Sequence, residues 1–326
     1  MTVELFQLLR PRELADALAA LEKYSSKIRI LAGGTDLLPS MRQRLFAPEY
    51  ILDIRQVKEL RGIRQTEQGI EIGAFTTLHE IERSDELKQD YSVLVEAAKT
   101  VASPVIRNMA TIGGNVCLDT RCLWYNQSLA WRKSCGFCIK KDGNICHVAP
   151  GGTKCWAAFS ADTPPALLCL GAEIEVASAL GSRRIPLEHF YTGEGDNYRQ
   201  LQPYELVTRI FLPRAAARYA GAYRKLRIRG SIDYPLAAVA VAWKQTNGDV
   251  EDLRIALTAV NPAPLLVEGV RSVLQREVRR ERMAEEIGEL AARTAKPLTT
   301  SALTPEYRRE MIRVFTKRAV LELVAG

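Results

Sequence analysis

The hydrophobic residues of the first fifty positions change from helical to strand spacing and back. Leucines recur at helical intervals after Pro11, which suits a first helical turn, so the pattern predicts a helix over 12–24. The short apolar run at 28–31 predicts a strand that enters a pair of glycines, and 37–45 returns to helical spacing. A helix, a strand and a second helix are therefore expected to open the fold.

Further along the chain, segments with strand and helix patterns are both frequent. Strands are predicted at 50–54, 63–64, 70–73, 173–178, 205–212, 223–228, 237–245 and 252–260. Helices are predicted at 87–102, 265–275, 277–295 and 305–324. Hairpins are expected around Gln68-Gly69, Leu180-Gly181 and Asn247-Gly248. The sequence predicts an α+β fold, in which the last lobe is a small sheet covered by helices.

The composition is that of a folded globular protein. The chain has 326 residues, of which 47% are apolar, so it can bury a substantial core in two or three lobes. Its longest apolar runs, at 166–170 and 236–243, fall far short of the roughly 18 residues that span a bilayer. The first residues lack the charged lead, long apolar stretch and cleavage site of a secretory signal. We therefore expect a cytoplasmic protein with no membrane partner.

Basic residues exceed acidic ones modestly, giving a formal net charge of +7. They are densest at 271–293 and 307–318, where they alternate with apolar residues at helical spacing, as on the solvated faces of amphipathic helices. Because no readout motif of a nucleic-acid binder accompanies them, no nucleic-acid partner is expected.

Two glycine-rich segments carry the first candidate chemistry. Ala32-Gly33-Gly34-Thr35-Asp36 follows the predicted strand at 28–31, and Thr111-Ile112-Gly113-Gly114-Asn115 comes about eighty residues later. Glycines leave backbone N–H groups uncovered, which suits a diphosphate, and two such loops can close on one extended dinucleotide from two sides. Neither has the GxGxxG spacing of a Rossmann fingerprint or the GxxxxGK(S/T) spacing of a P-loop. Taken singly, either loop is equally compatible with an ordinary glycine turn.

Other polar residues near these loops have structural interpretations. Thr77 and Glu80 fit a capping box that opens a short helix, and His79 inside it is expected at the surface. Asp162 is compatible with a helix cap. Cys169 lies in an apolar run, which predicts a small buried residue.

A third segment, 117–155, is crowded with thiols. It holds six of the seven cysteines of the chain: Cys117, Cys122, Cys135, Cys138, Cys146 and Cys155. Turn-forming glycines and asparagines lie among them, so the chain reverses repeatedly and places a cysteine near most bends. An odd number of cysteines in a chain without a secretory signal argues against a disulfide framework. The pattern therefore predicts a cage for a metal group that prefers thiolates.

Five motifs follow one another along the chain: AGGTDLLP at 32–39, IGAFTTLHE at 72–80, TIGGN at 111–115, ADTPPALL at 161–168 and YRKLRIRGSIDYPLAAVAVA at 223–242. In sequence and order they resemble the flavin-binding medium subunits of the xanthine dehydrogenase family of molybdenum enzymes. The resemblance covers nearly the whole chain. It implies a two-lobed FAD-binding domain of the vanillyl-alcohol oxidase (PCMH) type, with lobes at 1–57 and 58–214. A C-terminal domain of the CO dehydrogenase flavoprotein type would follow at 215–326.

The resemblance also implies which residues hold FAD. The two glycine loops would hold its diphosphate and ribitol, Asp162 would contact the flavin, and Val101 would lie beside it. Either Lys225 or its neighbour Arg224 would lie near the isoalloxazine ring, since the local alignment can slide by one residue. The full implied FAD-binding set is Ile30, Leu31, Ala32, Gly33, Gly34, Thr35, Asp36, Leu37, Val101, Thr111, Ile112, Gly113, Gly114, Asn115, Asp162, Arg224 and Lys225.

The chain departs from this family between the second glycine loop and Asp162, where about forty additional residues, at about 118–159, are inserted. An insert of this kind resembles that in the FAD-binding subunits of 4-hydroxybenzoyl-CoA reductases, where it houses an additional [4Fe-4S] cluster. Such a cluster needs four thiolates. Cys117 is tethered to the second glycine loop and is discarded first. The resemblance then favours as ligands Cys122, Cys138, Cys146 and Cys155, with Cys135 in reserve.

The composition of the insert fits a cluster but leaves an alternative open. It holds three of the four tryptophans of the chain, enough aromatic area to cover a cofactor. Its basic residues exceed its acidic ones, so they can offset the charge of a cluster or dock an acidic ferredoxin. A structural zinc ion held by four cysteines is the alternative, because Cys135 and Cys138 form a CxxC pair of the kind common in zinc sites. His147, beside Cys146, is expected to be a bystander.

The same resemblance implies that the chain would be an electron-transfer subunit of a molybdenum 4-hydroxybenzoyl-CoA reductase. Electrons would pass from reduced ferredoxin to the cluster, to FAD, to a small subunit with two [2Fe-2S] clusters, and to a large subunit with the molybdenum cofactor. There 4-hydroxybenzoyl-CoA would be reduced to benzoyl-CoA, in a dimer of heterotrimers. One alternative is an FAD medium subunit of another xanthine dehydrogenase-type hydroxylase. Another is a binding or assembly module stabilised by zinc.

Overall fold

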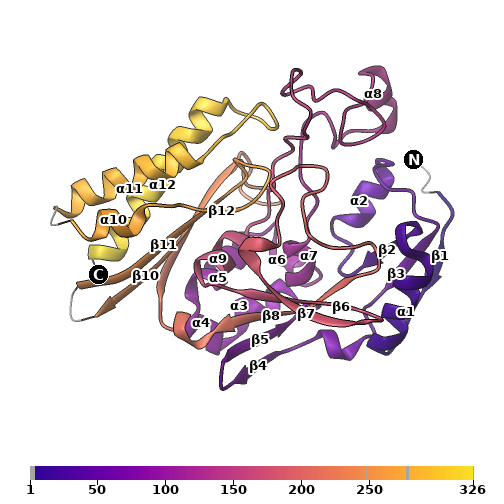
Figure 1. The fold of residues 1–326 in the computed structure, drawn as a ribbon, viewed down its shortest axis with the longest axis horizontal. Coiled ribbons are helices and arrows are strands. Elements are labelled where there is room, and N and C mark those ends of the chain that lie inside the picture. Colours follow the sequence, from indigo (N-terminus) through magenta and orange to yellow (C-terminus); the bar gives the residue numbers. More distant parts are fainter. Residues whose placement is uncertain (1–3, 247–248, 277–278, 326) are drawn as a thin grey trace.

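The computed structural model describes residues 4–246, 249–276 and 279–325, and its three sheets follow one another along the chain (Figure 1). The first sheet is parallel, with strand order β1-β3-β2, and one helix crosses between each pair of consecutive strands. Leu18 and Leu21 of the first helix pack in one core with Leu52 of the sheet. The elements are β1 (Gln7–Leu9), α1 (Leu14–Tyr24), β2 (Ile28–Leu31), α2 (Leu37–Arg42) and β3 (Tyr50–Asp53).

The second sheet is antiparallel and has strand order β4-β5-β8-β6-β7. Its strands are β4 (Ile63–Thr66), β5 (Gly69–Gly73), β6 (Glu173–Ser178), β7 (Gly181–Pro186) and β8 (Leu206–Pro213). Its central strand β8 is buried on both faces rather than alternately. The helices of this part are α3 (Leu78–Arg83), α4 (Asp85–Asp90), α5 (Ser92–Lys99), α6 (Pro104–Arg107), α7 (Ile112–Val116) and α9 (Thr163–Cys169).

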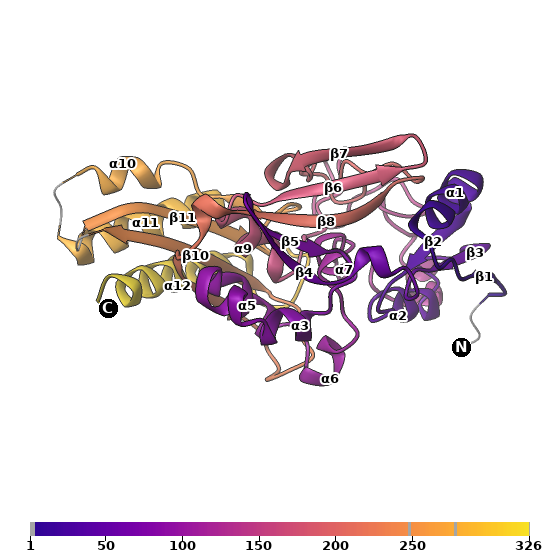
Figure 2. The same ribbon diagram turned by 90° about the horizontal axis from the view of Figure 1, so that it is seen from below.

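The third sheet lies between the C-terminal helices on one face and α5 and α9 on the other (Figure 1), at the opposite end of the molecule from the first sheet (Figure 2). Its strands, in the order β12-β11-β10-β9, are β9 (Ala220–Leu226), β10 (Ala237–Thr246), β11 (Asp249–Thr258) and β12 (Leu265–Leu266). Along β10, Val239 and Val241 pack with the C-terminal helices, whereas Ala238 and Ala240 pack with α5 and α9. The C-terminal helices are α10 (Val270–Leu274), α11 (Arg280–Thr294) and α12 (Pro305–Ala325).

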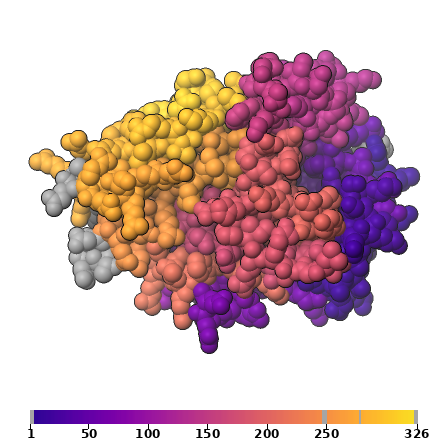
Figure 3. All heavy atoms as spheres, in the orientation of Figure 1, coloured from indigo at the N-terminus to yellow at the C-terminus, as the bar shows by residue number. Residues whose placement is uncertain are grey.

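The inserted segment projects from the body of the protein, with α8 (Leu129–Ser134) near its tip (Figure 1). In the space-filling view it forms a protrusion between the C-terminal helices and the N-terminal part (Figure 3). Its two ends lie side by side, because Arg121 and Ala158 exchange both backbone hydrogen bonds, at 2.7 and 2.8 Å. The insert is therefore a closed loop on a clamped base. Closing such a loop costs little more entropy as its length grows.

Most predicted elements are confirmed, including the capping box at Thr77 and the α+β class. The helix predicted over 87–102 is wrong: Tyr91, with φ −139° and ψ 46°, separates α4 from α5, and its hydroxyl donates to the Pro213 carbonyl at 3.2 Å. The helix predicted over 265–275 begins only at Val270, because Leu265–Leu266 pairs with β11 as β12.

Four single turns of 3-10 helix complete the inventory of the described chain: Ser25–Lys27, Lys58–Leu60, Leu187–His189 and Arg214–Ala216. The predicted turn at Asn247-Gly248 falls outside the described residues. The lobe boundaries at 57 and 214 remain predictions. In the described part of the chain, no helix combines the length and the apolar character needed to cross a membrane.

Arg308 supplies a test of how the C-terminal helices are held. It is fully buried in α12 and donates to three backbone carbonyls, those of Leu236 (2.8 Å), Leu298 (2.7 Å) and Ala259 (2.6 Å). Burial lowers its pKa to about 10, so it stays charged at neutral pH. We expect Arg308→Leu to lower the free energy of unfolding by about 3 kcal/mol, because buried carbonyls lose charged donors.

The matched control is Arg318→Leu, an exposed position on the same helix, which should change this free energy by less than about 0.5 kcal/mol. Urea unfolding followed by circular dichroism measures both variants. Equal midpoints for the two would contradict the role assigned to Arg308.

Candidate functional site

Both glycine loops line one cavity of about 790 Å³. This volume lies within the range of small-molecule and cofactor sites. The segment before α7, the turn before α2, the loop at 196–203 and the start of the insert all contribute to its wall. Of the predicted FAD-binding residues, those that line it are Ile30, Ala32, Gly33, Gly34, Thr35, Asp36, Leu37, Val101, Thr111, Gly113, Gly114, Asn115 and Asp162.

The first glycine loop, between β2 and α2, is pressed against the backbone before the second loop. A Cβ added to Gly33 would lie 1.8 Å from the carbonyl oxygen of Met109, so only glycine fits. Gly34 has a φ of +73°, in the left-handed region that favours glycine. The backbone N–H groups of residues 33–36 donate to no acceptor within the described chain. They are therefore available to an anionic group such as a diphosphate.

The second glycine loop differs from the prediction of uncovered N–H groups. The N–H of Gly113 donates to the Ala74 carbonyl at 2.9 Å, and that of Gly114 donates to the hydroxyl of Thr111 at 3.1 Å. Thr111 is thus the N-cap of α7. A Cβ on Gly113 would lie 2.7 Å from the Cβ of Ala74. The glycines of this loop permit close packing, and its side chains rather than its N–H groups shape the cavity wall.

Asp162 is held inside the protein by residues from distant segments. Lys225 of β9 donates to it at 3.0 Å and also to the Thr100 carbonyl at 3.1 Å, while the hydroxyl of Tyr223 donates at 2.8 Å. The side chains of Lys225 and Asp162 are only 3% and 4% exposed. Burial raises the pKa of Asp162, and the charge of Lys225 opposes that rise. Asp162 therefore links the cavity to the third sheet rather than capping α9 with its side chain.

Four residues of the predicted FAD-binding set lie outside the lining of this cavity: Leu31, Ile112, Arg224 and Lys225. Lys225 reaches it indirectly, through Asp162. Arg224 projects from the other face of β9 and pairs with Glu322 of α12. Of these two neighbouring cations, the structure therefore brings Lys225 to the site and leaves Arg224 on the C-terminal helices. Ile112 is fully buried in the core.

The thiols of the insert gather near one end of this cavity. Cys138, Cys146 and Cys155 are buried, and Cys122 is half-buried. Burial raises the pKa of Cys122 to about 11, and negative charge on Cys138 and Cys146 adds to that rise. Burial likewise raises the pKa of Cys155 to about 12, with additions from Asp196 and Cys146. The charges of Cys138 and Cys146 act on Cys122, and that of Cys146 acts on Cys155, so the four predicted ligands lie near one another in a desolvated region. Thiols must lose their protons to hold a metal.

The other two cysteines of the segment have different surroundings. Cys117 lines the cavity, and the pKa of its thiol is raised by burial and lowered by the nearby guanidinium of Arg199. Cys135 ends α8 and is half-buried. Within the residues that the structure describes, no three Cys, His, Asp or Glu side chains converge as a group that could hold a metal ion. A tetrahedral zinc site and a [4Fe-4S] cluster both need four thiolates around one centre, so neither group is shown by the described side chains.

Aromatic side chains cover part of this region. Trp124 stacks on His147, with ring centroids 4.4 Å apart, and lies 5.6 Å from Trp131. A ring nitrogen of His147 lies 2.5 Å from the Phe137 carbonyl oxygen. His147 therefore has a partner of its own beside the cysteines.

A polar junction that the sequence analysis missed ties three distant segments together at the cavity. Arg121 of the insert donates to Asp36 at 3.1 Å, and the hydroxyl of Tyr234 donates to the same oxygen at 3.0 Å. The guanidinium of Arg121 also lies over the ring of Tyr234, 4.0 Å from its centroid. Burial raises the pKa of Asp36, and Arg121 and Tyr234 oppose that rise. Residues so far apart in sequence carry no spacing signal that could have revealed this junction.

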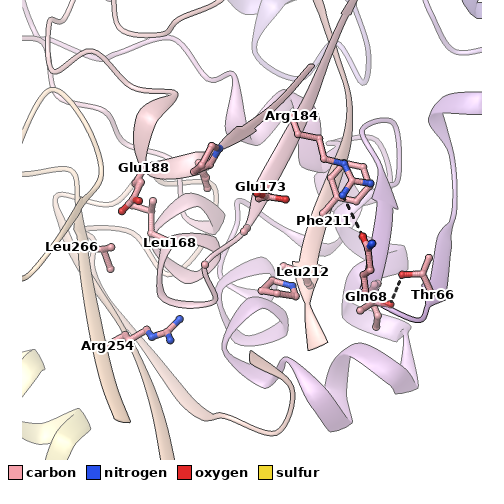
Figure 4. A pocket seen from close by; sticks show the side chains of 17 residues that line it. Thr66, Gln68, Leu168, Glu173, Arg184, Glu188, Phe211, Leu212, Arg254 and Leu266 are labelled. Atoms are coloured by element: carbon pink, nitrogen blue, oxygen red, sulfur yellow. Dashed lines mark hydrogen bonds between the residues drawn. The ribbon is translucent and has the colours of Figure 1, made fainter. Parts of the chain in front are cut away.

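A second cavity, of about 520 Å³, lies at the second sheet, away from the glycine loops (Figure 4). Charged side chains such as Glu173 and Arg254 line it, and Arg184 lies over the ring of Phe211, 3.6 Å from its centroid. None of the predicted FAD or metal residues contributes to its wall. The candidate site is therefore the cavity at the glycine loops.

Comparison with sequence families gives two matches that together span most of the chain. Residues 4–215 match the FAD binding domain in molybdopterin dehydrogenase, and residues 221–323 match the CO dehydrogenase flavoprotein C-terminal domain. The carbon monoxide dehydrogenase medium chain of Afipia carboxidovorans is 31% identical over 315 residues, covering 97% of this chain and 95% of its own. The glyceraldehyde dehydrogenase medium chain of Sulfolobus acidocaldarius is 28% identical over 319 residues, covering 98% of each chain.

Solved structures show the same similarity in three dimensions. A chain of the Cu,Mo-CO dehydrogenase in its cyanide-inactivated form superimposes with a TM-score of 0.82 at 31% identity, covering 100% of this chain and 99% of its own. A chain of the carbon monoxide dehydrogenase from Hydrogenophaga pseudoflava gives a TM-score of 0.80 at 27% identity, with the same coverage. The predicted arrangement of an FAD-binding domain followed by a C-terminal flavoprotein domain is thereby confirmed.

Gly33 provides a test of the cavity. In Gly33→Ala the new Cβ meets the Met109 carbonyl, so the first loop must move away from the second. We expect FAD to bind at least tenfold more weakly, a loss of about 1.4 kcal/mol or more. Gly151→Ala is the matched control, since nothing lies within 4 Å of a Cβ added there. Equilibrium dialysis with FAD measures both, and unchanged FAD affinity in Gly33→Ala would contradict this geometry.

Proposed function

The chain belongs to the family of FAD-binding medium subunits of the xanthine and CO dehydrogenases, and we propose that it carries electrons between a [4Fe-4S] cluster in its insert and FAD. We propose further that it serves a molybdenum enzyme that reduces 4-hydroxybenzoyl-CoA to benzoyl-CoA. The partners would be a large subunit with the molybdenum cofactor and a small subunit with two [2Fe-2S] clusters, assembled as a dimer of heterotrimers.

One observation carries the proposal: four neighbouring thiols, three of them buried, stand in an insert whose first residues line the FAD cavity. Leu118, Asp119, Tyr125 and Lys140 all belong to that lining. Tyr125 shares a small apolar cluster with Cys138 and Cys122. The thiols are thus next to the flavin-binding region rather than on a remote loop. A redox centre makes use of this position, whereas a purely structural ion would serve equally well elsewhere.

The residues of the chain bind and orient both groups. Free N–H groups at 33–36 suit the FAD diphosphate, and the buried Asp162 and Lys225 fix the wall near the flavin. The four thiols, Cys122, Cys138, Cys146 and Cys155, would hold the iron as thiolates and release their protons as they do so. When bound, the cluster exchanges single electrons and FAD exchanges one or two.

The reductase assignment rests on the insert, since its thiol-rich loop resembles that of the 4-hydroxybenzoyl-CoA reductases. The exposed face of the insert also suits an electron donor. On the insert, Leu123, Trp131 and Ile145 are 48%, 37% and 49% exposed, and Lys133 is exposed on α8, two residues after Trp131. Apolar contacts bordered by cations match the surface of an acidic ferredoxin. Reduced ferredoxin would thus deliver electrons at the insert.

A second candidate is favoured by the names of the relatives. These are medium chains or FAD subunits of carbon monoxide, glyceraldehyde and xanthine dehydrogenases, enzymes that oxidise their substrates. In that case electrons would leave this subunit for an acceptor such as NAD or a quinone. The assembled enzyme separates the two directions: reduced viologen with 4-hydroxybenzoyl-CoA yields benzoyl-CoA only in the first case, and NAD reduction by an oxidisable substrate indicates the second.

Single cysteine variants test the cluster and its ligands. Protein purified without oxygen should contain about four iron and four sulfide per chain. Cys138→Ala should lose them, because a buried ligand is removed, whereas Cys135→Ala should keep them and serves as the matched control. Iron and sulfide analysis with visible spectra measures this. The reverse result would overturn the ligand set, and zinc with no iron in the unmodified protein would overturn the cluster.

Charge reversal on α8 tests the docking of the donor. Lys133→Glu should slow reduction of the protein by an acidic ferredoxin by about threefold or more at low salt, because it removes favourable steering. Lys23→Glu makes the same charge change at an exposed position on α1, far from the insert, and should leave the rate nearly unchanged (Figure 1). Stopped-flow rates at several ionic strengths measure both. Equal rates for the two variants would contradict docking at this face.

A further inference from the structure

Lys140 is a buried cation that the proposed function leaves without a role. Its side chain is 5% exposed, and its ammonium donates to Asp119 at 2.8 Å and to the Gly195 carbonyl at 2.6 Å. A third hydrogen bond goes to the hydroxyl of Thr120. Three acceptors satisfy its three donors, so the position of the charge is fixed. A lysine that loses its hydration in this way is costly to bury.

One side of Lys140 faces the thiols through Gly195. The carbonyl that accepts from Lys140 belongs to a residue in contact with Cys155: a Cβ added to Gly195 would lie 2.8 Å from the Cys155 sulfur. The N–H of Gly195 also donates to the Cys155 carbonyl at 2.8 Å. On the other flank, the ring centroid of Tyr125 lies 4.7 Å from the ammonium, and the N–H of Tyr125 donates to the Cys122 carbonyl at 3.0 Å.

The opposite side of Lys140 belongs to the FAD cavity. Lys140 lines that cavity together with Asp119 and Tyr198, and its ammonium lies 5.5 Å from the centroid of the Tyr198 ring. The ammonium therefore lies between the cysteines and the flavin-binding region.

We propose that Lys140 raises the reduction potential of the cluster held by the insert, by fixing one positive charge between the thiols and the FAD cavity. This inference rests on the proposed function. Four thiolates around the oxidised core of a [4Fe-4S] cluster give a net charge of −2, and one added electron makes it −3. A fixed cation in a medium of low dielectric constant stabilises the more negative form more strongly, so reduction becomes easier.

Other cations of the insert are placed less effectively. Lys154 directly precedes Cys155 in sequence, but its side chain is 60% exposed and pairs with Glu194, so water and salt screen its charge. Arg132 is buried, yet its guanidinium donates to the Arg44 carbonyl at 2.8 Å, on the side of α2. The negative charge of Asp119 partly offsets the positive charge of Lys140, so removing the charge of Asp119 should raise the reduction potential of the cluster. Of the three cations compared, Lys140 is therefore the one whose charge is both buried and close to the thiols.

The test is a redox titration of the purified protein with its cluster and FAD, followed by electron paramagnetic resonance of the reduced cluster. Lys140→Gln should lower the equilibrium constant for reduction of the cluster at least tenfold, which is 59 mV for a one-electron couple. Asp119→Asn should shift it in the opposite direction. Lys154→Gln is the matched control, and its effect should be several times smaller because its charge is screened.

The outcomes separate this inference from the proposed function. If the Lys140→Gln protein contains iron and its cluster has the same reduction potential as that of the control variant, the role of Lys140 is overturned and the proposed function is left intact. A wild-type protein without iron overturns both. Should Lys140→Gln fail to keep its cluster, Asp119→Asn decides, because an unchanged or lowered potential in that variant contradicts the proposal. Lys140→Arg keeps the positive charge, so its cluster should keep most of the wild-type reduction potential.

Discussion

The candidate site depends on a contact between two pieces of backbone. Gly33 lies so close to the Met109 carbonyl that no side-chain carbon fits between them. That contact brings the N-terminal sheet against the segment that leads into α7, and the cavity is the space that remains beside it. Because protein interiors are close-packed, moving either loop would change the shape of the whole cavity. The glycines are therefore constrained by packing before any cofactor is considered.

Two carboxylates, the half-buried Asp36 and the buried Asp162, then join this cavity to the rest of the chain. Asp36 is held by Arg121 and Tyr234, and Asp162 by Lys225. Burying charged groups costs free energy that their attraction only partly repays, so such pairs are poor sources of stability. Their partners come from the insert and from the third sheet. These ion pairs therefore serve mainly to fix the relative position of three segments at one site, and contribute little to the stability of the fold.

Local sequence patterns predicted what depends on neighbouring residues. The helix at 12–24, the capping box at Thr77 and the two glycine loops follow from spacing alone. What the sequence could not reveal depends on distant partners. The N–H of Gly113 finds its acceptor in Ala74, thirty-nine residues earlier, so the second loop has fewer free donors than its glycines suggest.

The same reason accounts for the helix that is broken at Tyr91, whose hydroxyl bonds to a carbonyl 122 positions away. Propensity favours a continuous helix there, and tertiary packing overrides it.

The insert shows how a long loop can be added to a site without loosening it. Its base is clamped by Arg121 and Ala158, and the Leu123 N–H donates to the Thr300 carbonyl at 2.8 Å. Arg132 is anchored on the turn after α2, and Lys140 on the loop at Gly195. These attachments reach the N-terminal, middle and C-terminal parts of the chain. The redox centre proposed for the insert would need such multiple anchoring, because electron transfer weakens steeply with distance.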